Sequence, residues 1–127
     1  MNYCLLLLAI APLLTFADFT APSFTIDLST APEDRWSESV TSVITAHGWE
    51  NTFGPLLAYF EDTVGHQFFV DHDEQLRKVV IDDMPTEYKQ ELEGMYSAIV
   101  DLGFGDNITL GEIGMLQMYY ELNPFCT

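Results

Sequence analysis

Four stretches of the chain repeat apolar residues at intervals of three and four, the spacing that places side chains on one face of an α-helix. Glycines close the first two stretches and break the third, and Pro124 follows the last, where it disfavours helical geometry at the residue before it. We therefore predict four helices and interpret their apolar faces as core. In chain order, these faces contain Trp36, Val40, Val43, Ile44 and His47; Trp49, Phe53, Leu56, Leu57, Phe60 and Val64; Tyr88, Leu92, Met95, Ile99 and Val100; and Leu110, Ile113, Leu116 and Tyr120.

Local signals predict where the helices begin. Thr30 and Glu33 have the spacing of a capping box, and Thr109 and Glu112 repeat it before the last helix. The third predicted helix begins at residues 83–85. Residues 24–28 alternate apolar and polar side chains, as a half-buried strand does. The predicted fold class is therefore mainly α, with one N-terminal β-strand.

The segment between the second and third helices is rich in side chains that bind metals. His66, Asp71, His72, Asp73 and Glu74 lie close together in the sequence. However, a calcium-binding EF-hand loop that starts at Asp71 would need glycine at its sixth position, where the chain has leucine. The chain also lacks the paired histidines or cysteines of a zinc motif. We interpret this segment as a solvated loop and predict no metal site.

The beginning of the chain has the pattern of a secretory signal peptide. Residues 5–14 are apolar apart from Pro12, and such a run is too short to span a bilayer, which needs about 20 residues. Thr15 and Ala17 supply the small residues that signal peptidase requires before a cut after Ala17. The preceding residues lack the usual lysine or arginine, and a buried apolar segment of the fold is the other interpretation. We predict that residues 1–17 are a signal peptide and that no transmembrane segment follows.

The charge of the chain excludes some classes of partner. Four basic residues face twenty acidic ones, so the formal net charge is −16. Such a surface repels nucleic acid and anionic membranes. In an acidic lumen near pH 4.5 the charge falls to roughly −7, because carboxylates with pKa values near 4 begin to protonate. The composition therefore suits a lysosomal compartment, although an acidic extracellular protein is equally compatible with it.

Two short features remain as candidates for chemistry. Cleavage after Ala17 removes Cys4 and leaves Cys126 as the single thiol, and a lone cysteine in a secreted chain indicates an intermolecular bridge or a reactive group. Asn107 begins an Asn-Ile-Thr sequon in a turn rich in glycine and aspartate, which predicts a glycosylation site.

Two segments at the ends of the mature chain resemble one known family. Near the start, residues 23–28 read Ser-Phe-Thr-Ile-Asp-Leu and residues 31–36 read Ala-Pro-Glu-Asp-Arg-Trp. Near the end, Leu-Gly-Glu-Ile at residues 110–113 precedes Tyr-Glu at 120–121 and Phe-Cys-Thr at 125–127. In this order and spacing they are similar to acid ceramidase and N-acylethanolamine-hydrolysing acid amidase, while the middle of the chain diverges. The sequon at Asn107 falls where this family tolerates one.

The resemblance implies an N-terminal-nucleophile hydrolase that cleaves itself between Phe125 and Cys126. Residues 18–125 would form a helical α-subunit, and residues 126–127 would begin the catalytic β-subunit. Cys126 would be the nucleophile, because its freed α-amino group, with a pKa near 7.7, serves as the base for its own thiol. The activity implied is hydrolysis of the amide bond of N-acyl lipids, ceramide or N-acylethanolamine, with no cofactor. The αββα core of this family is formed mostly by the β-subunit.

The resemblance also implies that this chain lacks some of the catalytic residues. The family's catalytic arginine, aspartate and asparagine lie downstream of the cysteine, beyond Thr127, so we expect the chain alone to be inactive and to need a β-subunit as its partner. Its own contribution would be to cover the active site and line an acyl-chain channel, although for most of the candidate lining residues the core is the favoured interpretation. These candidates are Phe53, Tyr59, Phe60, Phe68, Phe69, Met95, Met115 and Met118.

A second class of function remains open. The resemblance favours the amidase as the family, whereas the chain taken alone favours a non-catalytic secreted helical protein that binds lipid or a partner chain. Lysosomal and extracellular locations both fit a signal peptide, and the residues do not separate ceramide from N-acylethanolamine as the substrate.

Overall fold

The computed structural model describes residues 23–122, and within this range every regular element is a helix. The α-helices of this range are α1 (Ser37–His47), α2 (Phe53–Val64), α3 (His66–Val80), α4 (Thr86–Asp101) and α5 (Leu110–Leu122). Single 3₁₀ turns precede α1, α2 and α5, namely η1 (Pro32–Asp34), η2 (Trp49–Asn51) and η3 (Gly105–Asn107). The mainly helical prediction is confirmed. The predicted signal peptide, residues 1–17, lies outside the described range.

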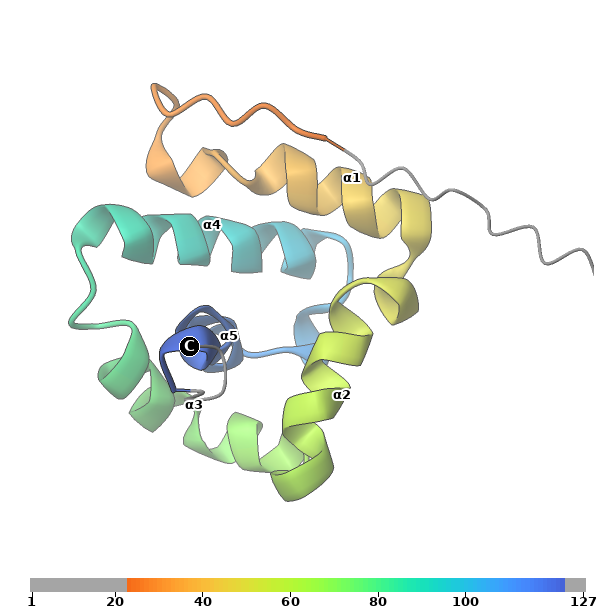
Figure 1. Ribbon diagram of the computed structural model, residues 1–127, viewed down its shortest axis with the longest axis vertical. Helices are drawn as coiled ribbons and strands as arrows, with labels where there is room; N and C mark the ends of the chain where they lie inside the picture. Colours follow the sequence, from red (N-terminus) through yellow and green to blue (C-terminus); the bar gives the residue numbers. More distant parts are fainter. Residues whose placement is uncertain (1–22, 123–127) are drawn as a thin grey trace, which may run out of the picture.

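Helix α5 lies at the centre of the domain, with other helices around it (Figure 1). In this view α5 is seen nearly end-on, with α4 above it, α2 to its right and α3 below it, and α1 lies along the outer side of α4. Residues 110–114, the first turn of α5, are all buried, as expected for a helix with neighbours on several sides. None of the helices in the described residues is long and apolar enough to cross a lipid bilayer.

Two glycines let α3 pack closely against α5. A Cβ atom added at Gly111 would lie 2.9 Å from Cβ of Leu76, and one added at Gly114 would lie 2.7 Å from Cγ1 of Ile81. Both distances are shorter than the contact distance of two carbon atoms, which is about 3.5–4.0 Å. The α3–α5 interface therefore depends on the absence of side chains at these two positions of α5.

The prediction that residues 66–74 form a solvated loop is wrong. They are the first part of α3, whose side chains Phe69 and Val80 are buried while Leu76 is half-buried. These apolar residues recur at intervals of seven and four, which is a helical spacing, but the polar residues between them obscured it. The helix forms because α5 offers an apolar surface for this narrow face.

The predicted strand at residues 24–28 is also wrong. Residues 23–27 have no regular structure, and Leu28 and Ser29 form a turn that Asp27 stabilises by accepting a hydrogen bond from the Ser29 N–H at 2.9 Å. A strand is stabilised by hydrogen bonds to a neighbouring strand, and residues 23–122 contain none. Alternation of side chains alone therefore did not produce a strand.

The capping box predicted at Thr30 and Glu33 does not form, because Arg35 organises this turn instead. Helix α1 begins only at Ser37, and neither η1 nor α1 has a side-chain cap. The guanidinium of Arg35 donates hydrogen bonds to the carbonyl oxygens of Leu28 at 2.8 Å and Thr30 at 3.0 Å. The backbone carbonyl groups of this segment are therefore hydrogen-bonded by the Arg35 side chain, and no helix cap forms.

The same guanidinium joins the N-terminal segment to α4. Arg35 forms ion pairs with Glu87 and with Glu91, the latter at 2.7 Å, and Trp36 Nε1 donates to the other carboxylate oxygen of Glu91 at 2.9 Å. We call Arg35, Trp36, Glu87 and Glu91 the Arg35 clamp. The side chains of Arg35 and Glu91 are 9% and 16% exposed, so the ion pair between them is largely shielded from water, whereas Glu87 is exposed.

The clamp predicts a stability that depends on pH. Burial raises the pKa of Glu91, but the hydrogen bonds from Trp36 and Arg35 and the charge of Arg35 lower it more, so its pKa lies below the ordinary value of 4.5. A carboxyl with a lower pKa in the folded state stabilises the fold above its unfolded pKa, and this contribution is lost as the pH falls through the folded pKa. We therefore expect Glu91→Gln to lower the thermal midpoint at about pH 7, and the difference from the parent to shrink towards about pH 3.

Thermal unfolding followed by circular dichroism across this pH range measures the effect. Glu93→Gln is the matched control, since Glu93 lies two positions further along α4 and is not part of the clamp. An equal loss of stability at both ends of the pH range would show that the charge of Glu91 has no role in the clamp.

The apolar faces are only partly core. Ile44, Leu57, Ile99 and Ile113 are buried as predicted. Several other members of the predicted faces remain exposed, so the prediction is wrong for them. They are Leu56, Tyr88 and Val100.

Candidate functional site

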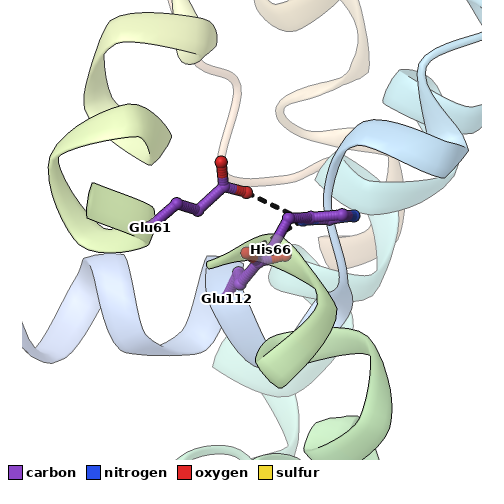
Figure 2. A group of neighbouring side chains, drawn as sticks. All are labelled: Glu61, His66 and Glu112. Carbon is purple, nitrogen blue, oxygen red and sulfur yellow. Dashed lines mark hydrogen bonds and ion pairs between the residues drawn. The ribbon is translucent and has the colours of Figure 1, made fainter. Parts of the chain in front are cut away.

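A cluster of one histidine and two glutamates lies where three helices meet. Glu61 comes from the last turn of α2, His66 is the first residue of α3, and Glu112 lies in the first turn of α5. The three side chains point toward one another, as Figure 2 shows. One potential ligand atom from each lies within 4.8 Å of the other two, and among the described residues this is the group with the geometry to hold a metal ion.

Gly65 makes the approach of Glu61 and His66 possible. This residue ends α2 and precedes α3 with a φ of 79°, a left-handed conformation that residues with a Cβ atom rarely adopt. The chain therefore turns sharply between the two helices. As a result, Nδ1 of His66 lies 2.7 Å from Oε1 of Glu61, five residues earlier.

The two ring nitrogens of His66 have different surroundings. Nε2 lies 3.1 Å from the backbone carbonyl oxygen of Asp106, which only accepts hydrogen bonds, so Nε2 carries a proton. Nδ1 faces the carboxylates of Glu61, at 2.7 Å, and Glu112, at 3.5 Å. The contact with Asp106 thus fixes the ring so that Nδ1 points at two carboxylates.

Glu112 is the buried member of the cluster, with 2% of its surface exposed. Its Oε2 accepts a hydrogen bond from the Thr109 N–H at 2.7 Å, and the Glu112 N–H donates to Oγ1 of Thr109 at 3.2 Å. The capping box predicted at these two residues is therefore confirmed. The other carboxylate oxygen of Glu112, Oε1, is buried without a hydrogen bond. The nearest positive group, when His66 is protonated, is Nδ1 of its ring at 3.5 Å.

The cluster shifts the proton affinity of two of its members. Burial lowers the pKa of His66, but the charge of Glu112 and the hydrogen bond and charge of Glu61 raise it more, so its pKa lies above the usual value. Burial raises the pKa of Glu112, and the Thr109 hydrogen bond and the charge of His66 offset this only in part. The raised pKa of His66 indicates that the two carboxylates stabilise a proton on its ring, whereas the raised pKa of Glu112 follows from its burial.

Apart from His66, the acidic and histidine side chains of residues 66–74, for which the sequence predicted no metal site, do not come together. On α3, Asp71 accepts a hydrogen bond from Gln67, His72 contacts the carbonyl oxygen of Phe68, and Glu74 pairs with Lys78. Asp73 accepts the Gly111 N–H at 2.8 Å and so caps the start of α5. Each side chain serves a helix rather than a common ion.

The sequence indicates two members of the cluster but not that they lie together, and it does not indicate the third. His66 belongs to the polar segment and Glu112 to the predicted capping box, whereas no sequence pattern singles out Glu61. The position of Glu61 and His66 on either side of a glycine was the available signal, but no spacing in the sequence indicates that Glu112, 46 residues after His66, lies beside them.

Of the other predicted site residues, the glycosylation site is described by the structure and the cleavage site is not. Asn107 ends η3 and its side chain is exposed, so a glycan at this position meets no steric barrier from the domain. Phe125 and Cys126 lie outside the described residues.

A groove runs between α2 and α5. Its walls are mostly apolar, and its volume is about 550 Å³. Two of its side chains are largely exposed, Leu56 by 56% and Tyr59 by 67%. The lining consists of Phe53, Pro55, Leu56, Tyr59, Phe60, Leu116 and Gln117.

Fold and site together define a small helical domain with a partly buried carboxylate–histidine cluster and an apolar groove. Comparison of the chain with protein-family models, with curated proteins and with solved structures finds no match in any of the three.

Proposed function

We propose that the chain is the helical subunit of a secreted or lysosomal cysteine amidase that hydrolyses the amide bond of N-acyl lipids. The chemistry of this proposal comes from the resemblance at residues 23–36 and 110–127, with Cys126 as the nucleophile released by cleavage after Phe125. The observation that carries it is the apolar groove between α2 and α5. An acyl chain is a ligand that such a groove suits, because burying each methylene contributes about 0.8 kcal/mol.

The position of the groove supports the same proposal. Leu116 and Gln117 form its α5 wall, and Cys126 follows the last residue of α5 by four positions. An acyl chain in the groove would therefore contact the helix that precedes Cys126 in the sequence. The exposed position of Asn107 agrees with passage through the secretory pathway, where glycans are added.

The test uses the complete reading frame as its messenger RNA carries it, with whatever residues follow Thr127, expressed in a secretory host. We expect acid incubation to give two polypeptides, the second beginning at Cys126, together with hydrolysis of an N-acyl amide. Cys126→Ala is expected to remain one polypeptide and to be inactive, since it lacks the thiol that performs both reactions. Intact mass and an N-acyl lipid hydrolysis assay measure the two outcomes.

A pair of matched variants tests the role of the groove. Leu56→Asp places a charge in the lining and is expected to reduce hydrolysis of long-chain substrates more than of short-chain ones, with cleavage before Cys126 unchanged. Val79→Asp is the control, because Val79 is 74% exposed on α3 and does not line the groove. Full amidase activity in Cys126→Ala would falsify the assignment of the nucleophile.

The groove also favours the second candidate, a non-catalytic secreted protein that binds lipid. Under this candidate the secreted protein binds a fluorescent fatty acyl probe, Leu56→Asp weakens binding, and neither cleavage nor hydrolysis occurs. Hydrolysis and its dependence on Cys126 therefore separate the two functions.

A further inference from the structure

Three acceptor atoms converge in the cluster of Glu61, His66 and Glu112. With the Nε2 proton of His66 donated to Asp106, the neutral ring presents a lone pair at Nδ1, and this lone pair faces two carboxylate oxygens. These three acceptors repel one another unless a positive species neutralises them, either a proton on Nδ1 or a metal ion bound by all three. The buried Oε1 of Glu112, which has no hydrogen bond, is one of these acceptors.

The donor set matches a particular class of cation. One imidazole nitrogen and two carboxylate oxygens suit zinc and other divalent transition metals, whereas calcium and magnesium prefer oxygen ligands alone. The ring is also held as metal-binding histidines are held, with the other N–H donated to a backbone carbonyl, here that of Asp106. Three protein ligands leave the fourth position of a zinc ion to water.

The geometry needs only a small adjustment to accept the ion. Ligand atoms about 2.1 Å from a tetrahedral zinc ion lie about 3.4 Å apart, and the three atoms here lie within 4.8 Å of one another. Oε1 of Glu61 lies 2.7 Å from Nδ1 of His66, which is closer than two ligands of one zinc ion, so this distance must open. The Glu61 side chain is 26% exposed and comes from the end of α2, so rotation about its own bonds can make this change. Glu112 and His66 are held by Thr109 and Asp106 and need not move.

We propose that Glu61, His66 and Glu112 form a binding site for a divalent transition-metal ion, with Zn²⁺ as the preferred ion. The ion links the end of α2 and the start of α3, which flank Gly65, to the first turn of α5. The bound ion joins α2 to the centre of the domain. The inference goes beyond the proposed amidase and does not depend on it.

The test uses the full chain, expressed without a histidine tag and treated with EDTA. We expect one zinc ion per chain by calorimetric titration. At a concentration about 100 times the dissociation constant, zinc is expected to raise the thermal midpoint by about 10 °C, because the ion binds the folded state. Cobalt is expected to give the visible absorption of a tetrahedral site, and EDTA to abolish it.

Three variants distinguish this site from other binding on the acidic surface. His66→Ala removes the nitrogen ligand and is expected to weaken zinc binding by at least about 100-fold, since even the loss of an outer partner costs 10–100-fold. Glu61→Gln removes the charge of one ligand and leaves the Thr109–Glu112 capping box intact, so it tests the site without changing the start of α5. His72→Ala is the control, because His72 is exposed on the same helix and outside the cluster.

The outcomes that overturn the proposal are distinct from those that overturn the amidase. Zinc binding that is equal in the parent and in His66→Ala, or lost in His72→Ala, places the ion elsewhere. The absence of any zinc-dependent rise in the thermal midpoint leaves the cluster with a proton in place of a metal. Neither result involves Cys126 or amide hydrolysis.

Discussion

Replacing Gly94 with alanine is expected to destabilise the domain by about 3 kcal/mol, near the upper end of the cost of overpacking a core. Gly94 lies in α4 and is buried beneath η1. A Cβ atom at this position would lie 1.8 Å from the carbonyl oxygen of Glu33 and 2.6 Å from its carbonyl carbon. Both are backbone atoms, so they cannot move aside by rotation of a side chain. The added methyl group must separate η1 from α4, where the Arg35 clamp holds the two together.

The sign of this effect is what makes it informative. By helix propensity alone, alanine in place of a helical glycine stabilises by about 0.5–1 kcal/mol. Ser97→Ala is the control, because Ser97 is exposed on the same helix and only the propensity changes there. Urea unfolding followed by circular dichroism gives both values. A Gly94→Ala protein as stable as the parent would mean that η1 does not pack on α4 in solution.

Replacing Trp49 with alanine is expected to cost about 3–5 kcal/mol, the usual range for deleting a buried aromatic side chain. Trp49 opens η2, is 6% exposed, and stacks on two rings. Its centroid lies 5.0 Å from that of Phe104 and 5.7 Å from that of Phe53, with interplanar angles of 11° and 19°. The side chain therefore joins the junction of α1 and α2 to the segment that precedes α5.

Two comparisons isolate this contribution. Trp49→Phe keeps an aromatic ring in the stack and is expected to lose clearly less stability than Trp49→Ala. Tyr88→Ala removes an aromatic side chain that is 60% exposed and is expected to stay within about 0.5 kcal/mol of the parent. Equal losses in Trp49→Ala and Tyr88→Ala, measured by urea unfolding, would contradict the burial of Trp49 in the core.

The ends of the helices were the most predictable feature of this protein. Gly48 and Gly65 were expected to end helices, and both do so with positive φ angles. Pro85 stands directly before α4, and the Thr109–Glu112 capping box opens α5 as predicted. These signals act over three or four residues, so they require no knowledge of the rest of the fold.

Predictions failed where a distant element decides the conformation. Residues 24–28 have the alternation of a strand but no strand within the described range to pair with. Thr30 and Glu33 have the spacing of a capping box, but Arg35 reaches the carbonyls of the segment and Glu91 holds Arg35. Residues 66–74 were predicted to form a loop because their few apolar side chains become meaningful only against α5. In each case a long-range contact outweighed the local signal.

The candidate site was predictable only in its parts. The sequence identifies His66 as a possible ligand and Glu112 as a helix cap, yet their meeting depends on the Gly65 turn and on the close approach of α3 to α5 at Gly111 and Gly114. No sequence pattern predicts that one carboxylate oxygen of Glu112 is buried without a hydrogen bond.

By itself the sequence determined the helical class, most helix ends and the acidic charge, because periodicity, caps and composition are local or additive properties. The tertiary structure alone decided that residues 66–80 form a helix, that Arg35 connects the N-terminal segment to α4, and that Glu61, His66 and Glu112 share one site. These outcomes depend on which surfaces pack together. Packing selects among conformations that differ little in local energy, through contacts between residues far apart in the chain.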